Sequence, residues 1–200
     1  MDSTEFFWRY SQRPDIKHAE LIEGVVYVGS PVNPERHGKP HFSLTCLLGV
    51  FAESTQGAHG ILESTIRLPS DHPSGVRNQP QPDIMLYWDE EHGGSAQFDE
   101  EGWLVSPPDL AAEVSNSSKS YDLFAKKDLY ARIGVREYIC WQVEDGRIDW
   151  WQLVDGEYVL LKADRYGVIR SVVFAGLSLD TRALLKRIPA AKLPRRPRSR

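Results

Sequence analysis

Apolar positions along the chain follow two patterns, short runs typical of strands and longer stripes with helical spacing. Strand-like runs occupy residues 25–29, 60–69, 81–88, 110–114, 136–143, 146–154 and 156–162. Helical spacing and helix-boundary residues predict helices over 14–24, from about residue 40, over 122–134 and over 180–188. Two shorter strands are expected at 103–105 and 171–174. The chain therefore mixes both kinds of element throughout.

The order of these elements predicts how they pair. Only the turns "EDG" and "DG" separate the strands 136–143, 146–154 and 156–162, which predicts an antiparallel meander toward the C-terminus. The helix over 122–134 instead joins two strand-like runs as a strand-helix-strand crossover. Together these features predict an α/β fold with a central mixed sheet flanked by helices.

Composition favours one globular domain, which we assign to residues 1–188. Of the 200 residues, 41% are hydrophobic and six are Trp, enough for a substantial core. Residues 1–185 carry 17 Lys and Arg against 28 Asp and Glu, a net charge of −11. The segment 189–200 is a basic tail, either disordered and solubilising or a flexible arm for a polyanion. The acidic body argues against a wide phosphate-binding face.

Other classes of protein find little support in the sequence. No apolar run approaches the roughly 18 residues of a membrane span, and the start "MDSTEFFWRY" lacks the features of a signal peptide. We therefore expect a cytoplasmic protein without a membrane partner. Cys46 and Cys140 form no CxxC or Cys/His pattern, so we expect reduced cysteines and no structural zinc.

Two acids stand at the ends of neighbouring apolar runs. Asp83 opens "PDIMLY" and Glu113 closes "DLAAEV". If these strands pair about 4.8 Å apart, both carboxylates project from one region and repel each other, so they need a cation or a shared proton. Oxygen ligands of this kind suit Mg²⁺ or Mn²⁺. The alternative is that both acids merely cap strand ends in solvent.

The helix after Glu113 adds a cation. Asp122, Lys126 and Tyr130 are spaced four apart and share one helix face. One interpretation pairs Asp122 with Lys126 as an exposed ion pair. The other brings Lys126 back to the two carboxylates, where an ammonium stabilises charge developing on a phosphate.

The ordered segments "QPDIMLY", "PPDLAAEVSNSSKSYDLFAKKDLYARIGVREYICWQVEDGRIDWWQL" and "GVIRSVVFAGLSLDTRALL" resemble the Uma2 family of restriction-endonuclease-like proteins. The opening "AELIEGVVYVGSPVNPERHGKPHFSLTCLLGVF" is similar to that family too, so the resemblance covers nearly the whole chain. It implies the restriction-endonuclease-like fold of the PD-(D/E)XK nucleases.

Carried onto this sequence, the resemblance implies that Asp83 and Glu113 are ligands of a catalytic Mg²⁺ or Mn²⁺. The superfamily lysine should stand two positions after Glu113, where this chain has Ser115. Lys126 matches a lysine that Uma2-like sequences carry in the following helix, and we interpret it as a migrated catalytic lysine. Its neighbour Lys127 faces about 100° away on a helix and is the weaker candidate.

Further polar residues are secondary candidates. Glu20 matches an acid of the family's N-terminal helix and would join the metal shell or orient water; alternatively it is an exposed helix acid. His37 and His41 precede a helix and are expected to be structural or exposed. We expect three serines to satisfy backbone groups and cap the helix rather than act as nucleophiles, since no GxSxG context surrounds them: Ser115, Ser117 and Ser118.

These inferences predict a metal-dependent endonuclease that hydrolyses phosphodiester bonds, with DNA as the substrate. Two alternatives stay open, a non-catalytic nucleic-acid-binding or oligomeric regulatory protein of the same fold, and a hydrolase of a small phosphorylated compound. The resemblance and the apolar meander also favour a homodimer.

Overall fold

The computed structural model describes residues 1–29, 31–69, 72, 77–115 and 121–186. The expected basic tail, residues 189–200, lies outside this range, so its assignment stays a prediction. No helix in the described ranges is long and apolar enough to cross a membrane.

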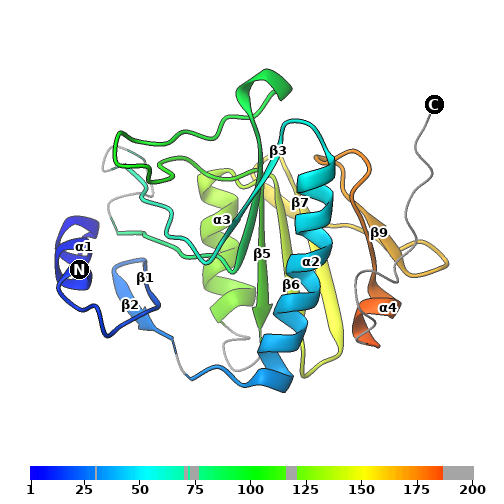
Figure 1. Ribbon diagram of the computed structural model, residues 1–200, viewed down its shortest axis with the longest axis horizontal. Coiled ribbons are helices and arrows are strands. Elements are labelled where there is room, and N and C mark those ends of the chain that lie inside the picture. Colours follow the sequence, from blue (N-terminus) through cyan, green and yellow to red (C-terminus); the bar gives the residue numbers. More distant parts are fainter. Residues whose placement is uncertain (30, 70–71, 73–76, 116–120, 187–200) are drawn as a thin grey trace.

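A six-stranded mixed sheet forms the centre of the molecule, with strands in the order β3-β4-β5-β6-β7-β8 (Figure 1). Only β5 and β6 are parallel, because the crossover helix joins them. The strands of the sheet are β3 (Ala58–Leu62), β4 (Ile84–Trp88), β5 (Leu110–Ser115), β6 (Glu137–Gln142), β7 (Arg147–Val154) and β8 (Glu157–Leu160). This arrangement confirms the predicted α/β class, the mixed sheet and the antiparallel meander, formed by β6, β7 and β8.

Helices cover both faces of the sheet, and two small hairpins complete the fold (Figure 1). The hairpins pair β1 (Ala19–Ile22) with β2 (Val25–Val28), and β9 (Val168–Arg170) with β10 (Ser178–Asp180). The helices are α1 (Ser3–Ser11), α2 (Lys39–Ser54), α3 (Lys127–Ile133) and α4 (Thr181–Leu185). Short helical turns are η1 (Pro34–Gly38), η2 (Glu90–His92) and η3 (Tyr121–Lys126).

Two apolar clusters fill the space between the helices and the sheet. Leu44 and Leu48 of α2 pack with Ala112 and Val114 on one face of β5. On the opposite face, Leu129, Tyr130 and Ile133 of α3 pack with Ala111. Because side chains alternate along a strand, the odd-numbered residues of β5, including Glu113, face α3. The sheet therefore directs Glu113 into the layer that carries Lys126.

The pairing of β4 with β5 ends beside Asp83. The two strands are antiparallel with Ile84 opposite Ala112, so continuing the register by one residue sets Asp83 opposite Glu113. Pro82 has no backbone N–H for a further ladder bond. The Asp83 carboxylate instead accepts the Val114 N–H at 2.7 Å. A carboxylate thus takes the place of the backbone partner at the point where the ladder stops.

The predicted helix over 14–24 is wrong, because this segment contains β1 and the turn that leads into β2, while β2 confirms the strand predicted over 25–29. Glu23 and Gly24 both adopt positive φ angles, 52° and 76°, as a two-residue hairpin turn requires. The β-branched run that follows pairs back onto β1, and Val25 lies opposite Ile22. The N-terminal helix of the chain is α1, which the sequence patterns did not predict.

Three other strand predictions need correction. The strand expected at 171–174 is absent, and the strand of this region is β9 instead. The N–H groups of Val172 and Val173 donate to the buried Glu137 carboxylate at 2.6 and 3.0 Å, and the Ser171 hydroxyl donates to it at 2.7 Å. Burial raises the pKa of Glu137 despite these bonds. A non-local carboxylate therefore takes the N–H groups that a strand would have used.

The strand predicted over 60–69 and the short strand at 103–105 are also smaller than expected. The first ends at Leu62, and Glu63 beyond it has a positive φ of 45°. In the second, Leu104 forms only isolated bridges, with Ile66 and with Phe98. Positive φ is unfavourable for a residue with a side chain and interrupts a regular strand.

Substituting Ala for either of two glycines, one inside a helix and one at a helix end, should change the stability of the fold in opposite directions. Gly134 ends α3 with a φ of 92°, and Gly49 lies inside α2; an added Cβ meets no atom within 4 Å at either position. Replacing Gly134 with Ala should lower the free energy of unfolding by about 1–2 kcal/mol, because the left-handed backbone strains an L-residue. Replacing Gly49 with Ala should raise it by about 0.5–1 kcal/mol. Urea unfolding of both variants measures the signs, and equal effects would contradict the α3 end described above.

Candidate active site

The candidate site lies where β5 ends and β4 begins, under the start of α3 (Figure 1). Asp83 and Glu113 stand opposite each other there, as the register of β4 and β5 requires. Glu113 is 3% exposed, whereas Asp83 is half-buried. The sheet thus brings together the two acids that the sequence singled out.

Lys126, at the junction of η3 and α3, supplies a buried ammonium to this region. Its Nζ lies 2.8 Å from Oε1 of Glu113 and 2.9 Å from Oε1 of Glu20. The Lys126 side chain is 3% exposed, so solvent screens these ion pairs only weakly. Segments of π-helix such as η3 occur frequently at functional sites. The side chain of Asp122, the other proposed partner of Lys126, lies outside the described part of the chain.

Glu20 comes to the site from a strand, β1, and not from the N-terminal helix that the resemblance implied. Its Oε1 also accepts the backbone N–H of Gln81 at 2.6 Å, and its Oε2 lies 3.5 Å from Nε2 of His18. Burial opposes ionisation of Glu20, but Lys126 and the hydrogen bonds from His18 and Gln81 outweigh burial and lower its pKa. Glu20 is therefore an ionised partner of Lys126.

Tyr130 is a member of the site to which the sequence assigned no role. Its hydroxyl donates to Oε1 of Glu113 at 2.8 Å, one helical turn beyond Lys126. Burial, followed by the charge of Glu113, raises the pKa of Tyr130 well above 10, so the group remains a neutral donor. The four-residue spacing from Lys126 was the available signal, since it places both side chains on one helix face.

The carboxylates of the cluster offer oxygen ligands for a cation. Glu20 and Glu113 pair with Lys126, and Asp83 adds a third carboxylate at the same strand end. Within the described residues, no group of three or more His, Cys, Asp or Glu side chains is close enough to hold a metal ion. Two carboxylates with waters and a substrate phosphate are nonetheless a sufficient set for Mg²⁺, which dehydrates reluctantly. The donor set of Asp83 and Glu113 therefore fits a hard divalent cation.

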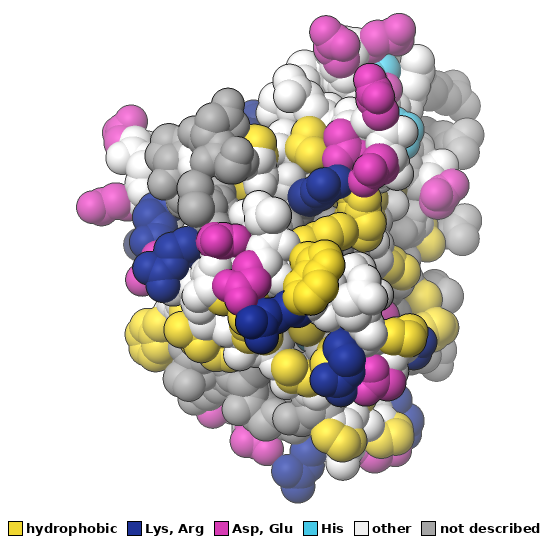
Figure 2. Space-filling model, turned by 90° about the vertical axis from the view of Figure 1, so that its left-hand side faces the viewer, with side chains coloured by type: hydrophobic (Ala, Val, Ile, Leu, Met, Phe, Trp, Pro, Cys, Tyr) yellow, Lys and Arg dark blue, Asp and Glu magenta, His cyan; other side chains and the backbone are white. Residues whose placement is uncertain are grey.

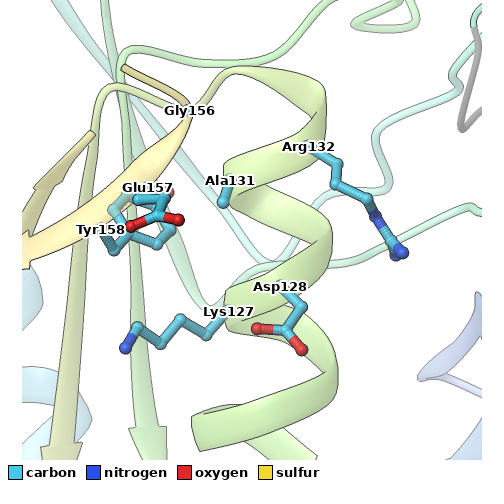
Figure 3. A pocket seen from close by; sticks show the side chains of 7 residues that line it. All are labelled: Lys127, Asp128, Ala131, Arg132, Gly156, Glu157 and Tyr158. Carbon is cyan, nitrogen blue, oxygen red and sulfur yellow. The ribbon is translucent and has the colours of Figure 1, made fainter. Parts of the chain in front are cut away.

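Lys127 points away from this cluster. Its Nζ lies 4.5 Å from the centre of the Trp151 ring, in a shallow cavity of about 440 Å³ between α3 and β8 (Figure 3). Asp128 and Arg132 of α3 line the same cavity, as do Glu157 and Tyr158 of β8 and Gly156 in the turn before it. The two adjacent lysines therefore point in different directions from the helix and contact different partners.

Of the other secondary candidates, the two histidines lie close to each other, and one of them lies close to Glu63. Nδ1 of His41 lies 3.6 Å from Glu63, and the His41 ring lies 5.4 Å from that of His37. Ser115 was expected to satisfy backbone groups, but its buried Oγ makes no hydrogen bond within the described chain. Ser117 and Ser118 lie outside the described residues.

The mixed sheet between helices, with two acids at adjoining strand ends and a buried lysine beside them, has the architecture that the sequence predicted for a restriction-endonuclease-like protein. The chain belongs to the Uma2 family, described as "Putative restriction endonuclease", whose profile matches residues 4–182. The fold is also similar to a crystal structure titled a "putative nuclease belonging to DUF820" from Anabaena variabilis. That similarity has a TM-score of 0.62 at 13% identity and covers 86% of this chain and 91% of the other. No curated protein sequence matches the chain.

Removing the Lys126 ammonium should destabilise the fold strongly. We expect Lys126→Met to lower the free energy of unfolding at pH 7 by about 3–5 kcal/mol, because two buried carboxylates lose their counter-charge. The matched control is Lys127→Met, which loses one cation–π contact and should cost about 0.5–1 kcal/mol. Equal losses in urea unfolding would contradict the buried ion pairs.

The stability lost in Lys126→Met should depend on pH. Because the pKa of Glu20 is lowered in the folded protein, its stabilising contribution is present above its unfolded value of about 4.3 and is lost as pH falls through the folded value. The stability difference between wild type and Lys126→Met should therefore shrink below about pH 4.3. Urea unfolding at pH 7 and in acid measures this difference, and a gap that widened in acid would contradict the assignment.

Proposed function

We propose that the chain is a metal-dependent endonuclease that hydrolyses phosphodiester bonds of DNA. The observation that carries the proposal is the buried Lys126, held between Glu20 and Glu113 at the strand end where the register sets Asp83 opposite Glu113. The family supports a nuclease, and the residues suggest how one would work.

Asp83 and Glu113 are the proposed ligands of Mg²⁺ or Mn²⁺. A bound ion of this kind supplies positive charge that polarises a phosphate and acidifies water. The chain fixes the proposed ligands before binding, since Asp83 accepts the Val114 N–H and Glu113 accepts both Lys126 and Tyr130. Prefixed ligands lose little conformational freedom when an ion binds.

Lys126 is the proposed catalytic cation, and Glu20 is its positioning residue. Two carboxylates hold the ammonium at a fixed point, so it needs no reorganisation as negative charge develops on a nearby phosphate. Glu20 in turn is fixed by the Gln81 N–H. In this proposal Glu20 acts through Lys126 rather than on the metal, a narrower role than the sequence indicated.

DNA is the proposed substrate, although the charge of the body is unfavourable for it. On the face shown in Figure 2, Lys and Arg side chains are interspersed with acidic and apolar side chains and form no broad basic patch. A small phosphorylated substrate would tolerate this surface better, because binding to a nucleic-acid backbone depends on neutralising several phosphates.

Cleavage of supercoiled plasmid and of short single-stranded DNA with Mg²⁺ or Mn²⁺ at low salt tests the activity. Wild type should cut, and Asp83→Asn should reduce cutting at least 100-fold; the Asn oxygen can still accept the Val114 N–H, so the substitution changes mainly the charge. Lys126→Met should be inactive at a temperature where circular dichroism shows it folded, while Lys127→Met should cut normally. An Asp83→Asn protein as active as wild type would overturn the metal assignment.

Salt dependence separates DNA from a small substrate. Binding of a short duplex to Asp83→Asn, measured between 50 and 200 mM salt, should give a slope of log affinity against log salt of about −3 or steeper, as three or more neutralised phosphates require. Duplex binding with a slope near zero, together with intact plasmid for wild type, would favour a small phosphorylated compound. Duplex binding whose affinity falls steeply with salt, without plasmid cleavage by wild type, would favour the non-catalytic alternative.

A further inference from the structure

The hydroxyl of Tyr130 touches a proposed metal ligand directly, and its separate effect on that ligand can be isolated. It donates to Oε1 of Glu113 at 2.8 Å, the same oxygen that accepts from Lys126 at 2.8 Å. The two donors stand one helical turn apart on a continuous helical segment. Oε1 of Glu113 therefore accepts two hydrogen bonds, one from Lys126 of η3 and one from Tyr130 of α3.

The ring of Tyr130 is itself held in place. It is fully buried, and its centre lies 5.2 Å from that of Tyr138 on β6. Tyr138 stacks on Trp151 of β7 with the ring centres 5.5 Å apart. A column of rings anchored in the sheet therefore fixes the point from which the Tyr130 hydroxyl donates.

We propose that Tyr130 is a positioning residue that sets the orientation of the Glu113 carboxylate for metal binding. The inference rests on the proposed function, because it assigns Tyr130 to the metal ligand of that site. The plane of the Glu113 carboxylate turns about the Cγ–Cδ bond, and each hydrogen bond that it accepts restricts that rotation. Lys126 donates from a long side chain, whereas Tyr130 donates from a rigid, buried ring. Hydrogen bonds of this kind orient metal ligands, and losing one typically weakens metal affinity 10–100-fold.

A second tyrosine, the half-buried Tyr158, provides the comparison. The Tyr158 hydroxyl donates to the backbone carbonyl of Val135 at 2.8 Å, on the same side of the sheet but away from the carboxylates. Tyr130→Phe and Tyr158→Phe each remove one hydroxyl that donates a hydrogen bond, the first from a buried ring and the second from a half-buried one. Only the first removal leaves a proposed metal ligand with fewer donors.

The test is titration of the full chain with Mn²⁺, without DNA, by calorimetry. We expect Tyr130→Phe to bind Mn²⁺ at least 10-fold more weakly than wild type, and Tyr158→Phe to bind within 2-fold of wild type. In cleavage at saturating DNA, added Mn²⁺ should restore most of the Tyr130→Phe rate, with KM for DNA unchanged. A misoriented Glu113 weakens metal binding, and a higher Mn²⁺ concentration compensates for weaker binding. An unfolded protein would not recover activity in this way.

Three results would overturn the proposal. One is equal Mn²⁺ affinity for wild type and Tyr130→Phe. Another is an equal loss of Mn²⁺ affinity in Tyr158→Phe, which would mark a general effect of removing a hydroxyl from this side of the sheet. Failure of wild type to bind Mn²⁺ at all would overturn both this inference and the metal-dependent function. If wild type binds Mn²⁺ but does not cleave DNA, only the assignment of DNA as substrate is wrong. The comparison of Mn²⁺ affinities then still tests the role of Tyr130.

Discussion

The buried ammonium of Lys126 joins three parts of the chain that otherwise belong to separate layers. It binds Glu113 of the central sheet and Glu20 of the N-terminal hairpin, and it stands at the start of the crossover helix. A charge that is 3% exposed is unfavourable without close partners, so the sheet, hairpin and helix must all be in place before it is compensated. The geometry of the site therefore depends on this one residue more than on any other.

The sequence predicted much of the fold because its signals there are local. The meander follows from two short turns, and the crossover follows from an amphipathic segment between two apolar runs. Predictions failed where distant residues decide the structure. The segment 171–174 has the β-branched residues of a strand, yet Glu137 takes its N–H groups. No pattern within the segment itself reveals a carboxylate from another strand.

The residues of the candidate site also fall into those that local sequence signals predicted and those that depend on distant contacts. Asp83 and Glu113 could be paired from the sequence because each stands at the end of an apolar run, and Lys126 could be added from helical spacing and the family resemblance. Glu20 was assigned to a helix because the turn at Glu23 and Gly24 was interpreted as a helix end rather than a hairpin. Tyr130 was on the right helix face, but only coordinates reveal that its hydroxyl reaches Glu113.

The position of Glu20 has a consequence for the order in which the molecule assembles. Glu113 and Lys126 are 13 residues apart, so their contact closes a short loop, whereas Glu20 meets Gln81 across 61 residues and Lys126 across a longer stretch still. Closing longer loops costs more entropy and tends to come later. During synthesis the hairpin emerges early, and its backbone partner at Gln79 follows well before the crossover helix that carries Lys126. The contact of Glu20 with Lys126 is then a late folding event, and the lysine gains its second carboxylate only when the N-terminal and central parts of the chain have met.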